Sequence, residues 1–293
     1  RTQRKTLDSG NLDAIGGVPS RMRMIGILFV GLYAWAADSD AIVRKALSSE
    51  ISRQQKLGNY TWEEKSIEKM FDQKGKLQST HSKVFENLII DGSEYRRMIE
   101  DDGSPLDDSR AQKEQEKMDR EIAKRHAESP EQRKERLDRQ AKRRQESIRF
   151  REEVIEAFHF SIAGEEKMQG FDCWKIQAEP KPGYVAQSRE GKLLLGKVRG
   201  TMWITKASSD LVKVDVETTQ KLTFGGFLAS LSPGAHIDIE MMRVNDELWY
   251  PRTIHVGLNA RALLKHVNIE EELSYRNFRK FQAESKLVAT TER

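Results

Sequence analysis

Asp238 and Glu240 are the two carboxylates in this 293-residue sequence whose spacing suggests acid–base chemistry. Residues i and i+2 of a strand share one face of a sheet, so the two carboxyl groups would be neighbours there. They alternate with Ile237, Ile239 and Met241, however, which is the ordinary pattern of a half-buried strand. The pattern therefore favours a structural role for the pair on the wet face of a strand.

Other motifs of catalysis or cofactor binding are missing from the sequence. It contains no G-x-S-x-G elbow, no H-E-x-x-H, no P-loop and no G-x-G-x-x-G. The adjacent Gly225 and Gly226 do not make a phosphate cradle, and His255 and His266 have no nucleophile near them in the sequence. The single cysteine, Cys173, cannot form an internal disulfide or a Cys-based zinc site. We therefore expect a protein that is not an enzyme and that carries no metal or other cofactor.

Large aromatic and apolar side chains recur in separate predicted strands. One face of a curved antiparallel sheet has to be covered by apolar groups, and a partly covered face can form a pocket for an acyl chain. The alternative is that the same side chains fill an ordinary core. The candidate ligand-binding residues are Trp62, Tyr95, Trp174, Met202, Trp203, Phe224 and Trp249.

The N-terminal 36 residues have the pattern of a secretory signal peptide. The basic segment Arg21–Met24 precedes the apolar run Ile25–Ala36, which is shorter than the roughly 20 residues of a spanning helix. An Ala34-x-Ala36 pattern predicts cleavage near Ala36/Ala37, and translation is expected to begin within the basic segment. No cysteine follows the run, so we expect a soluble periplasmic protein without a lipid anchor.

The charge balance gives little support for nucleic-acid binding. The full chain has 50 Lys and Arg against 46 Asp and Glu, a formal net charge of +4. Residues 1–36 hold five basic and two acidic residues, so the remainder has 45 against 44 and a net charge of +1. Nucleic-acid binding needs a net positive footprint, and we therefore expect no nucleic-acid partner.

Residues 37–293 are expected to form a single domain that is mainly β with helices (α+β). A helix is predicted over residues 38–56, and turns are predicted at Asp91-Gly92 and Gly164–Glu166. About ten strands joined by short turns indicate an antiparallel meander, which must curl or close to avoid long exposed edges. The predicted strands are Asn59–Phe71, Lys83–Ile90, Glu94–Ile99, Phe158–Ile162, Phe171–Ala178, Val198–Thr205, Leu211–Phe224, His236–Val244, Leu248–Leu258 and Val267–Phe281.

A charged insertion at about residues 107–156 interrupts this pattern. Lys, Arg, Glu and Gln dominate it, and Ser129-Pro130 divides it into two predicted helices, 107–128 and 130–156. The simplest interpretation is a solvent-exposed helical hairpin. A nucleic-acid arm around Lys142–Arg144 is the second, although interleaved acidic residues and missing aromatic residues disfavour it. A coiled coil that binds a partner is the third, disfavoured because no apolar seam persists.

Six short segments, most of them built around aromatic residues, follow one another in a recognisable order. They are Gly58–Trp62, Gly170–Ile176, Gly200–Ile204, Leu211–Val216, Glu247–Arg252 and Tyr275–Phe281. This order resembles that of the outer-membrane lipoprotein-sorting proteins, the LolA/LolB-like superfamily. The resemblance covers roughly residues 157–281 and fits residues 38–100 more loosely.

The resemblance implies a large curved antiparallel sheet that forms an unclosed half-barrel, with helices in its mouth. It also implies non-covalent binding of lipid or lipoprotein acyl chains on a concave apolar face, for outer-membrane lipoprotein sorting. The missing lipid-modified cysteine is similar to the soluble carriers rather than to the lipid-anchored acceptors, so we expect only transient membrane contact. The alternative is a periplasmic sensor or regulatory module of the same fold, whose charged helices at 107–156 dock an envelope protein.

Overall fold

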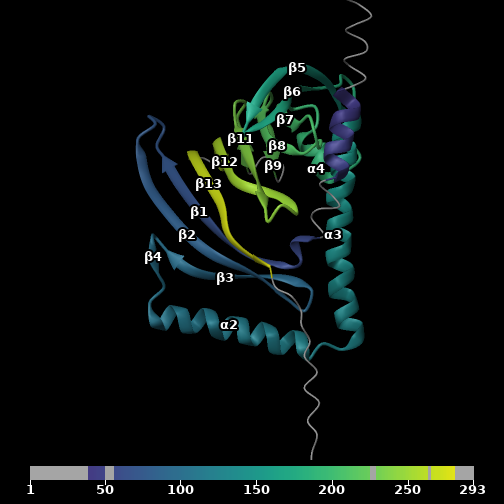
Figure 1. Cartoon of the computed structure of the whole chain (residues 1–293). Coiled ribbons are helices and arrows are strands. Elements are labelled where there is room, and N and C mark those ends of the chain that lie inside the picture. Colours follow the sequence, from purple (N-terminus) through teal and green to yellow (C-terminus); the bar gives the residue numbers. More distant parts are fainter. Residues whose placement is uncertain (1–38, 50–55, 225–228, 263–264, 281–293) are drawn as a thin grey trace, which may run out of the picture.

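The computed structural model describes residues 39–49, 56–224, 229–262 and 265–280 (Figure 1). Within these ranges thirteen strands form one antiparallel sheet, in the order β4-β3-β2-β1-β13-β12-β11-β8-β7-β6-β5, with β10 pairing with β12 and β9 with β10. The strands are β1 (Tyr60–Phe71), β2 (Leu77–Ile90), β3 (Ser93–Asp101), β4 (Ser104–Pro105), β5 (Phe158–Met168), β6 (Phe171–Pro180), β7 (Val198–Thr205), β8 (Leu211–Thr218), β9 (Leu222–Phe224), β10 (Ala229–Leu231), β11 (His236–Val244), β12 (Leu248–Ala262) and β13 (Lys265–Lys280).

The sheet is curved and unclosed. β4 and β5 lie at its two edges, and β1 pairs with β13, which joins the first strands of the chain to the last. Figure 1 shows the sheet bending around a concave side, with α3, α4 and the helix of residues 39–49 beside its open mouth. This is the α+β half-barrel that the sequence predicts. The predicted signal segment and the Gly225-Gly226 pair lie outside the described residues.

The structure confirms one predicted turn and corrects another. Asp91 and Gly92 have φ angles of 45° and 75°, as a tight hairpin turn requires. The turn predicted at Gly164–Glu166 is wrong, because β5 runs through this segment and turns only at Gln169-Gly170. Gly164 instead sits at a register shift with φ of 154°, a bulge conformation that glycine adopts without steric cost.

The strand predicted over 211–224 is also shorter than expected, because the chain leaves the ladder at Thr218. The Thr218 hydroxyl donates to the carbonyl oxygen of Ser232 (3.1 Å) and accepts from the amide of Ala235 (3.0 Å). These bonds tie the end of β8 to the start of β11, so residues 222–224 form the separate strand β9.

Both inserted helices lie where the sequence predicts them. α2 spans Asp108–His126 and α3 spans Pro130–Ala157, and the short α4 spans Arg189–Leu194. Ser129 and Gln132 form a reciprocal capping box at the start of α3, with Pro130 at its first position. The two helices meet as an L instead of lying side by side (Figure 1).

Two arginines fix the corner of this L to the turn between β2 and β3. Arg125, which is buried, donates to the carbonyl oxygens of Ile90 (2.6 Å) and Ser93 (3.0 Å). Arg136 donates to the Ser93 hydroxyl (2.6 Å) and pairs with Glu128 (2.8 Å). The corner is therefore held by hydrogen bonds from charged donors, which are stronger than neutral ones.

The other end of α3 is held by a buried carboxylate. Glu153 is 6% exposed and accepts hydrogen bonds from the Ser188 hydroxyl and from the backbone amides of Gln187 and Ser188. Burial raises its pKa, but these hydrogen bonds outweigh burial and hold the pKa below its ordinary value. A Cβ on Gly191 would overlap the Glu153 carboxylate, so glycine makes room for it.

Candidate functional site

An apolar cavity of about 360 Å³ lies between the sheet and the helices beside its mouth. Leu47 enters it from the helix of residues 39–49, Phe150 and Val154 from α3, and Leu194 and Leu195 from the α4 segment. This volume lies in the lower part of the roughly 300–1,000 Å³ range of small-molecule sites. The sheet contributes Phe158, Ala178, Val198, Met202, Leu211, Val214, Val216, Val256 and Leu258, among others.

The sequence of β8 explains why the sheet is apolar on this side. Side chains alternate between faces along a strand, so Val214 and Val216 line the cavity. Asp215 and Glu217 line a pocket on the opposite face. Gly200 of β7 pairs with Val216, and a Cβ there would lie 2.9 Å from the carbonyl oxygen of Asp215. Glycine therefore permits this close approach and leaves the cavity floor without a side chain.

His236 lies where the apolar cavity meets the polar face of the sheet. It lines both the cavity and the polar pocket behind it, as does Arg199. The imidazole covers Gly257 on β12, where a Cβ would overlap the ring. His236, Arg199 and Thr218 are the polar residues among those that line the cavity.

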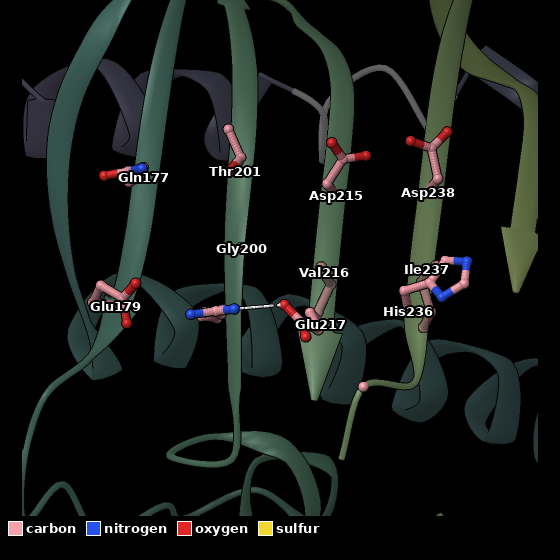
Figure 2. A pocket seen from close by; sticks show the side chains of 12 residues that line it. Gln177, Glu179, Gly200, Thr201, Asp215, Val216, Glu217, His236, Ile237 and Asp238 are labelled. Atoms are coloured by element: carbon pink, nitrogen blue, oxygen red, sulfur yellow. Dashed lines mark hydrogen bonds and ion pairs between the residues drawn. The ribbon is translucent and has the colours of Figure 1, made fainter. Parts of the chain in front are cut away.

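A polar pocket of about 650 Å³ occupies the other face of the same strands. Figure 2 shows it from this face, with side chains of β6, β7, β8 and β11 in front and helices behind the sheet. Arg199 and Glu217 form an ion pair across β7 and β8 (2.8 Å). The lining residues also include Gln177, Glu179, Thr201, Asp215, His236 and Asp238.

Asp215 and Asp238 form a carboxylate pair in this pocket. They are partners across β8 and β11, and Lys213 lies 2.7 Å from Asp238 and 3.6 Å from Asp215. Burial, together with hydrogen bonding to Asp238, raises the pKa of Asp215 to about 6. Burial also raises the pKa of Asp238, but hydrogen bonds from Asp215 and Lys213 outweigh it and lower the pKa. The pair therefore retains a proton on Asp215 below about pH 6.

The structure thus gives Asp238 a different neighbour from the one that sequence spacing suggests. Asp215 lies directly opposite it, whereas Glu240 is opposite Lys213. Side chains opposite each other on adjacent strands are closer than residues i and i+2 of one strand. Strand pairing between residues distant in sequence determines this contact, so the spacing of residues along one strand did not reveal it.

Met202 is the sequence-predicted ligand residue that lines the apolar cavity. Met202 belongs to a first buried core cluster, with Phe158, Ile176 and Ile204 among its members. Trp174 packs against this cluster, and the Lys206 ammonium lies 4.2 Å from the Trp174 ring centroid. Trp203 and Trp249 belong to a second cluster with Cys173, and the Trp203 indole donates to Glu166 (2.9 Å). Met202 and Trp203 are consecutive on β7 and therefore face opposite sides of the sheet.

The other predicted ligand residues lie farther along the sheet. Trp62 is buried on β1 in a third cluster, stacked on Phe278 with a centroid distance of 6.2 Å. Tyr95 is on β3, where burial and two carboxylates of α2, Glu114 and Glu121, raise its pKa. Phe224 belongs to β9, and its side chain lies outside the described part of the structure. The predicted residues are therefore spread over several clusters, and their role in ligand binding stays a prediction.

Aliphatic residues that sequence reasoning did not select form most of the cavity. Val214 and Val216 belong to the alternating segment Leu211–Val216, which predicted a strand but not which face it buries. Leu195 and Phe150 come from segments without a strand pattern. Their place in the cavity depends on how the helices pack over the sheet.

Two searches of the described residues add to this account. In that part of the chain, no cluster of three or more His, Cys, Asp or Glu side chains has an arrangement that could hold a metal ion. None of the described helices is both long and apolar enough to cross a membrane.

Comparisons with known proteins find similarity in structure only. No family model and no curated protein matches the sequence. Among solved structures, an outer membrane lipoprotein-sorting protein domain from Vibrio parahaemolyticus has 12% identity and a TM-score of 0.33, and the match covers 83% of this chain and 95% of that one. A LolA superfamily protein from Nitrosomonas europaea has 7% identity and a TM-score of 0.31, with 83% and 94% covered.

A third similar structure is a protein complex. The MucA/MucB complex of Pseudomonas aeruginosa matches with 9% identity and a TM-score of 0.22, over 84% of this chain and 100% of that one. The first two matches carry the superfamily names that the sequence resemblance gave. All three identities are below 25% and all three TM-scores are below 0.5, so function has to be argued from the residues of this chain.

Proposed function

We propose that this chain is a non-enzymatic binding protein that holds an acyl chain of a lipid or lipoprotein in the apolar cavity. The observation that carries the proposal is the lining of that cavity, which is almost wholly aliphatic and aromatic and is shared by sheet and helices. Each methylene group moved from water into such a site contributes about 0.8 kcal/mol. Binding of this kind needs no covalent chemistry.

The polar end of such a ligand would lie near His236 and Arg199. Both residues border the cavity and the polar pocket, and their side chains lie on the polar side (Figure 2). The Arg199 guanidinium donates to Glu217 through two of its nitrogens, and His236 is exposed. These groups would orient a headgroup, while the aliphatic residues supply most of the binding free energy.

The proposal extends to an exported carrier that works in outer-membrane lipoprotein sorting. Its support is the signal-like pattern of Arg21–Met24 and Ile25–Ala36 and the resemblance of residues 157–281 to the lipoprotein-sorting superfamily. A periplasmic sensor that docks an envelope protein through residues 107–156 is the alternative with the same cavity. A stable protein partner that is lost on deleting residues 107–147, together with no ligand bound by the full chain, would favour the alternative.

Extraction of the purified chain tests the proposal. The full chain is expressed with its N-terminal segment, purified from the bacterial envelope without detergent, and extracted with organic solvent for mass spectrometry. About one acylated molecule per chain is the expected result, because an apolar cavity of this size is unfavourable when filled with water. A folded chain that releases no acylated molecule and binds no added fatty acid would contradict the proposal.

A further inference from the structure

The middle of α3 is exposed on all sides. Every residue from 137 to 147 is exposed, including Leu137 at 39%. Arg136 at the corner and Glu153 near the end hold α3 on either side of this stretch, and within it Gln140 accepts a hydrogen bond from the Ser93 hydroxyl (3.1 Å). Figure 1 shows α3 running from its corner with α2 to the end of the sheet near α4. The stretch is therefore a solvent-exposed part of a helix whose position is fixed by contacts at both of its ends.

The segment of residues 139–151, which lies between Asp138 and the acidic pair Glu152-Glu153, is strongly basic. Between residues 139 and 151 there is a single acidic residue, Glu146. The basic residues of the same segment are Arg139, Lys142, Arg143, Arg144, Arg149 and Arg151. α2, by contrast, has nearly balanced charges: Asp and Glu lie among its Lys and Arg along the whole helix. The charge is thus concentrated in one part of the insertion.

We propose that the exposed basic section of α3, residues 139–149, docks on anionic phospholipid headgroups. Each Lys or Arg near an anionic membrane surface increases the affinity by up to about tenfold, and the contributions of neighbouring residues combine. The functional meaning of this docking rests on the proposed acyl-chain binding, because it would bring the cavity to the membrane from which a ligand is taken.

The side-chain pattern favours a headgroup layer over a protein groove. A protein that binds a helix recognises apolar anchors at spacings of i, i+3, i+4 and i+7. Leu137 and Ala141 are the only such residues between positions 137 and 147, and the next one is Ile148. At about 100° per residue, Arg139, Lys142, Arg143 and Arg149 lie on one side of the helix, and Arg144 lies off that side. A basic side without apolar anchors fits an anionic headgroup layer better than an apolar protein groove.

The basic section leads directly to the cavity. Phe150 and Val154, in the next turns of α3, line it. At 1.5 Å per residue, Arg144 lies about 9 Å along the helix from Phe150. A headgroup layer in contact with Arg144 and Arg149 is therefore within about two helical turns of the apolar lining.

The test is binding of the full chain to vesicles, measured by co-sedimentation. Vesicles of phosphatidylcholine alone are compared with vesicles containing roughly 30% phosphatidylglycerol, whose charge attracts basic segments. The test variant is Lys142→Gln/Arg143→Gln/Arg144→Gln. The matched control removes three exposed basic residues from α2, as Lys113→Gln/Arg120→Gln/Lys124→Gln.

We expect the chain to bind the anionic vesicles and not to bind the neutral ones. Binding to the anionic vesicles should weaken as the salt concentration is raised. The α3 variant should bind about tenfold or more weakly, and the α2 control should stay within about twofold of the unmodified chain. Equal binding to both vesicles, no binding, or an equal loss in the control would overturn the proposal. Binding to nucleic acid or to an acidic protein by a chain that ignores vesicles would also overturn it.

A second measurement separates this inference from the proposed function. Uptake of a fluorescent fatty acid is measured without vesicles, and the α3 variant should match the unmodified chain because it leaves the cavity residues unchanged. A chain that takes up no fatty acid but binds anionic vesicles through α3 would contradict the proposed function and leave the docking surface standing. A chain that takes up fatty acid but ignores the vesicles would do the reverse.

Discussion

At the scale of single residues, strand pairing brings together charged side chains that are distant in the sequence. Asp215 and Asp238 lie opposite each other with Lys213 beside them, and the pKa of Asp215 is raised to about 6. Like charges directly opposite on adjacent strands are destabilising. Val214 and Val216, on either side of Asp215, line the cavity. The ionisation of this pair is therefore close to the candidate ligand site.

The first prediction concerns this carboxylate pair. Because the pKa of Asp215 in the folded protein lies above its ordinary value of 3.8, its contribution to stability is full below about pH 4 and is lost as the pH rises through about 6. Carboxyl-carbon NMR should show Asp215 titrating near pH 6. In Asp238→Asn the midpoint should fall toward the ordinary value, because the neighbouring carboxyl group is gone. An Asp215 midpoint near pH 4 in the unmodified chain would contradict this account.

The second prediction concerns Glu153. Replacement by Gln removes the charge that three donors of the α4 segment share, and we expect the free energy of unfolding to fall by about 2 kcal/mol. Because the folded state lowers its pKa, Glu153 stabilises above its ordinary pKa of 4.5, and this stabilisation is lost as the pH falls through the lowered value. Urea unfolding at pH 7 measures the loss. The exposed neighbour Glu152, changed to Gln, should alter stability by less than about 0.5 kcal/mol.

At the scale of elements, local signals in the sequence predicted the helices better than their arrangement. Ser129 and Pro130 indicate the start of α3, and Asp91-Gly92 indicates the β2–β3 turn. Nothing local shows that Arg125 and Arg136 reach that same turn, since the contacts join residues more than thirty positions apart in the sequence. The L of α2 and α3 therefore could not be predicted from helix propensity or capping.

The third prediction tests the corner between α2 and α3. Arg125→Ala leaves the carbonyl oxygens of Ile90 and Ser93 without their charged donor, which costs about 1–3 kcal/mol locally. Hydrogen exchange in α2 should become about tenfold or more faster, while exchange in β5–β8 stays unchanged. The exposed Arg120→Ala serves as the control. Faster exchange throughout the sheet would mean that Arg125 supports the whole fold and not this corner alone.

At the scale of the whole molecule, the sheet separates two kinds of surface. One face carries the apolar cavity under the helices, and the other carries the polar pocket of Figure 2. The strand pattern predicted an antiparallel sheet that curls or closes, and the family resemblance implied that it is unclosed with a concave apolar face. It did not show which residues share that face, because one-residue shifts at bulges such as those near Trp203 and Gly164 reverse the alternation. Of the predicted residues, Met202 lines the cavity, while Trp203 faces the opposite side.

The measurement that tests the central claim most directly is a titration of the chain with a fluorescent fatty acid. Two substitutions place the same large side chain on opposite faces of the sheet: Val216→Trp fills the cavity, and Thr201→Trp enlarges the polar face. Both variants are first shown by circular dichroism to be folded. We expect Val216→Trp to weaken binding by about tenfold or more, since it displaces several methylene groups of the ligand. Thr201→Trp should bind as the unmodified chain does. Equal affinity in all three proteins, or no binding by the unmodified chain, would contradict the account.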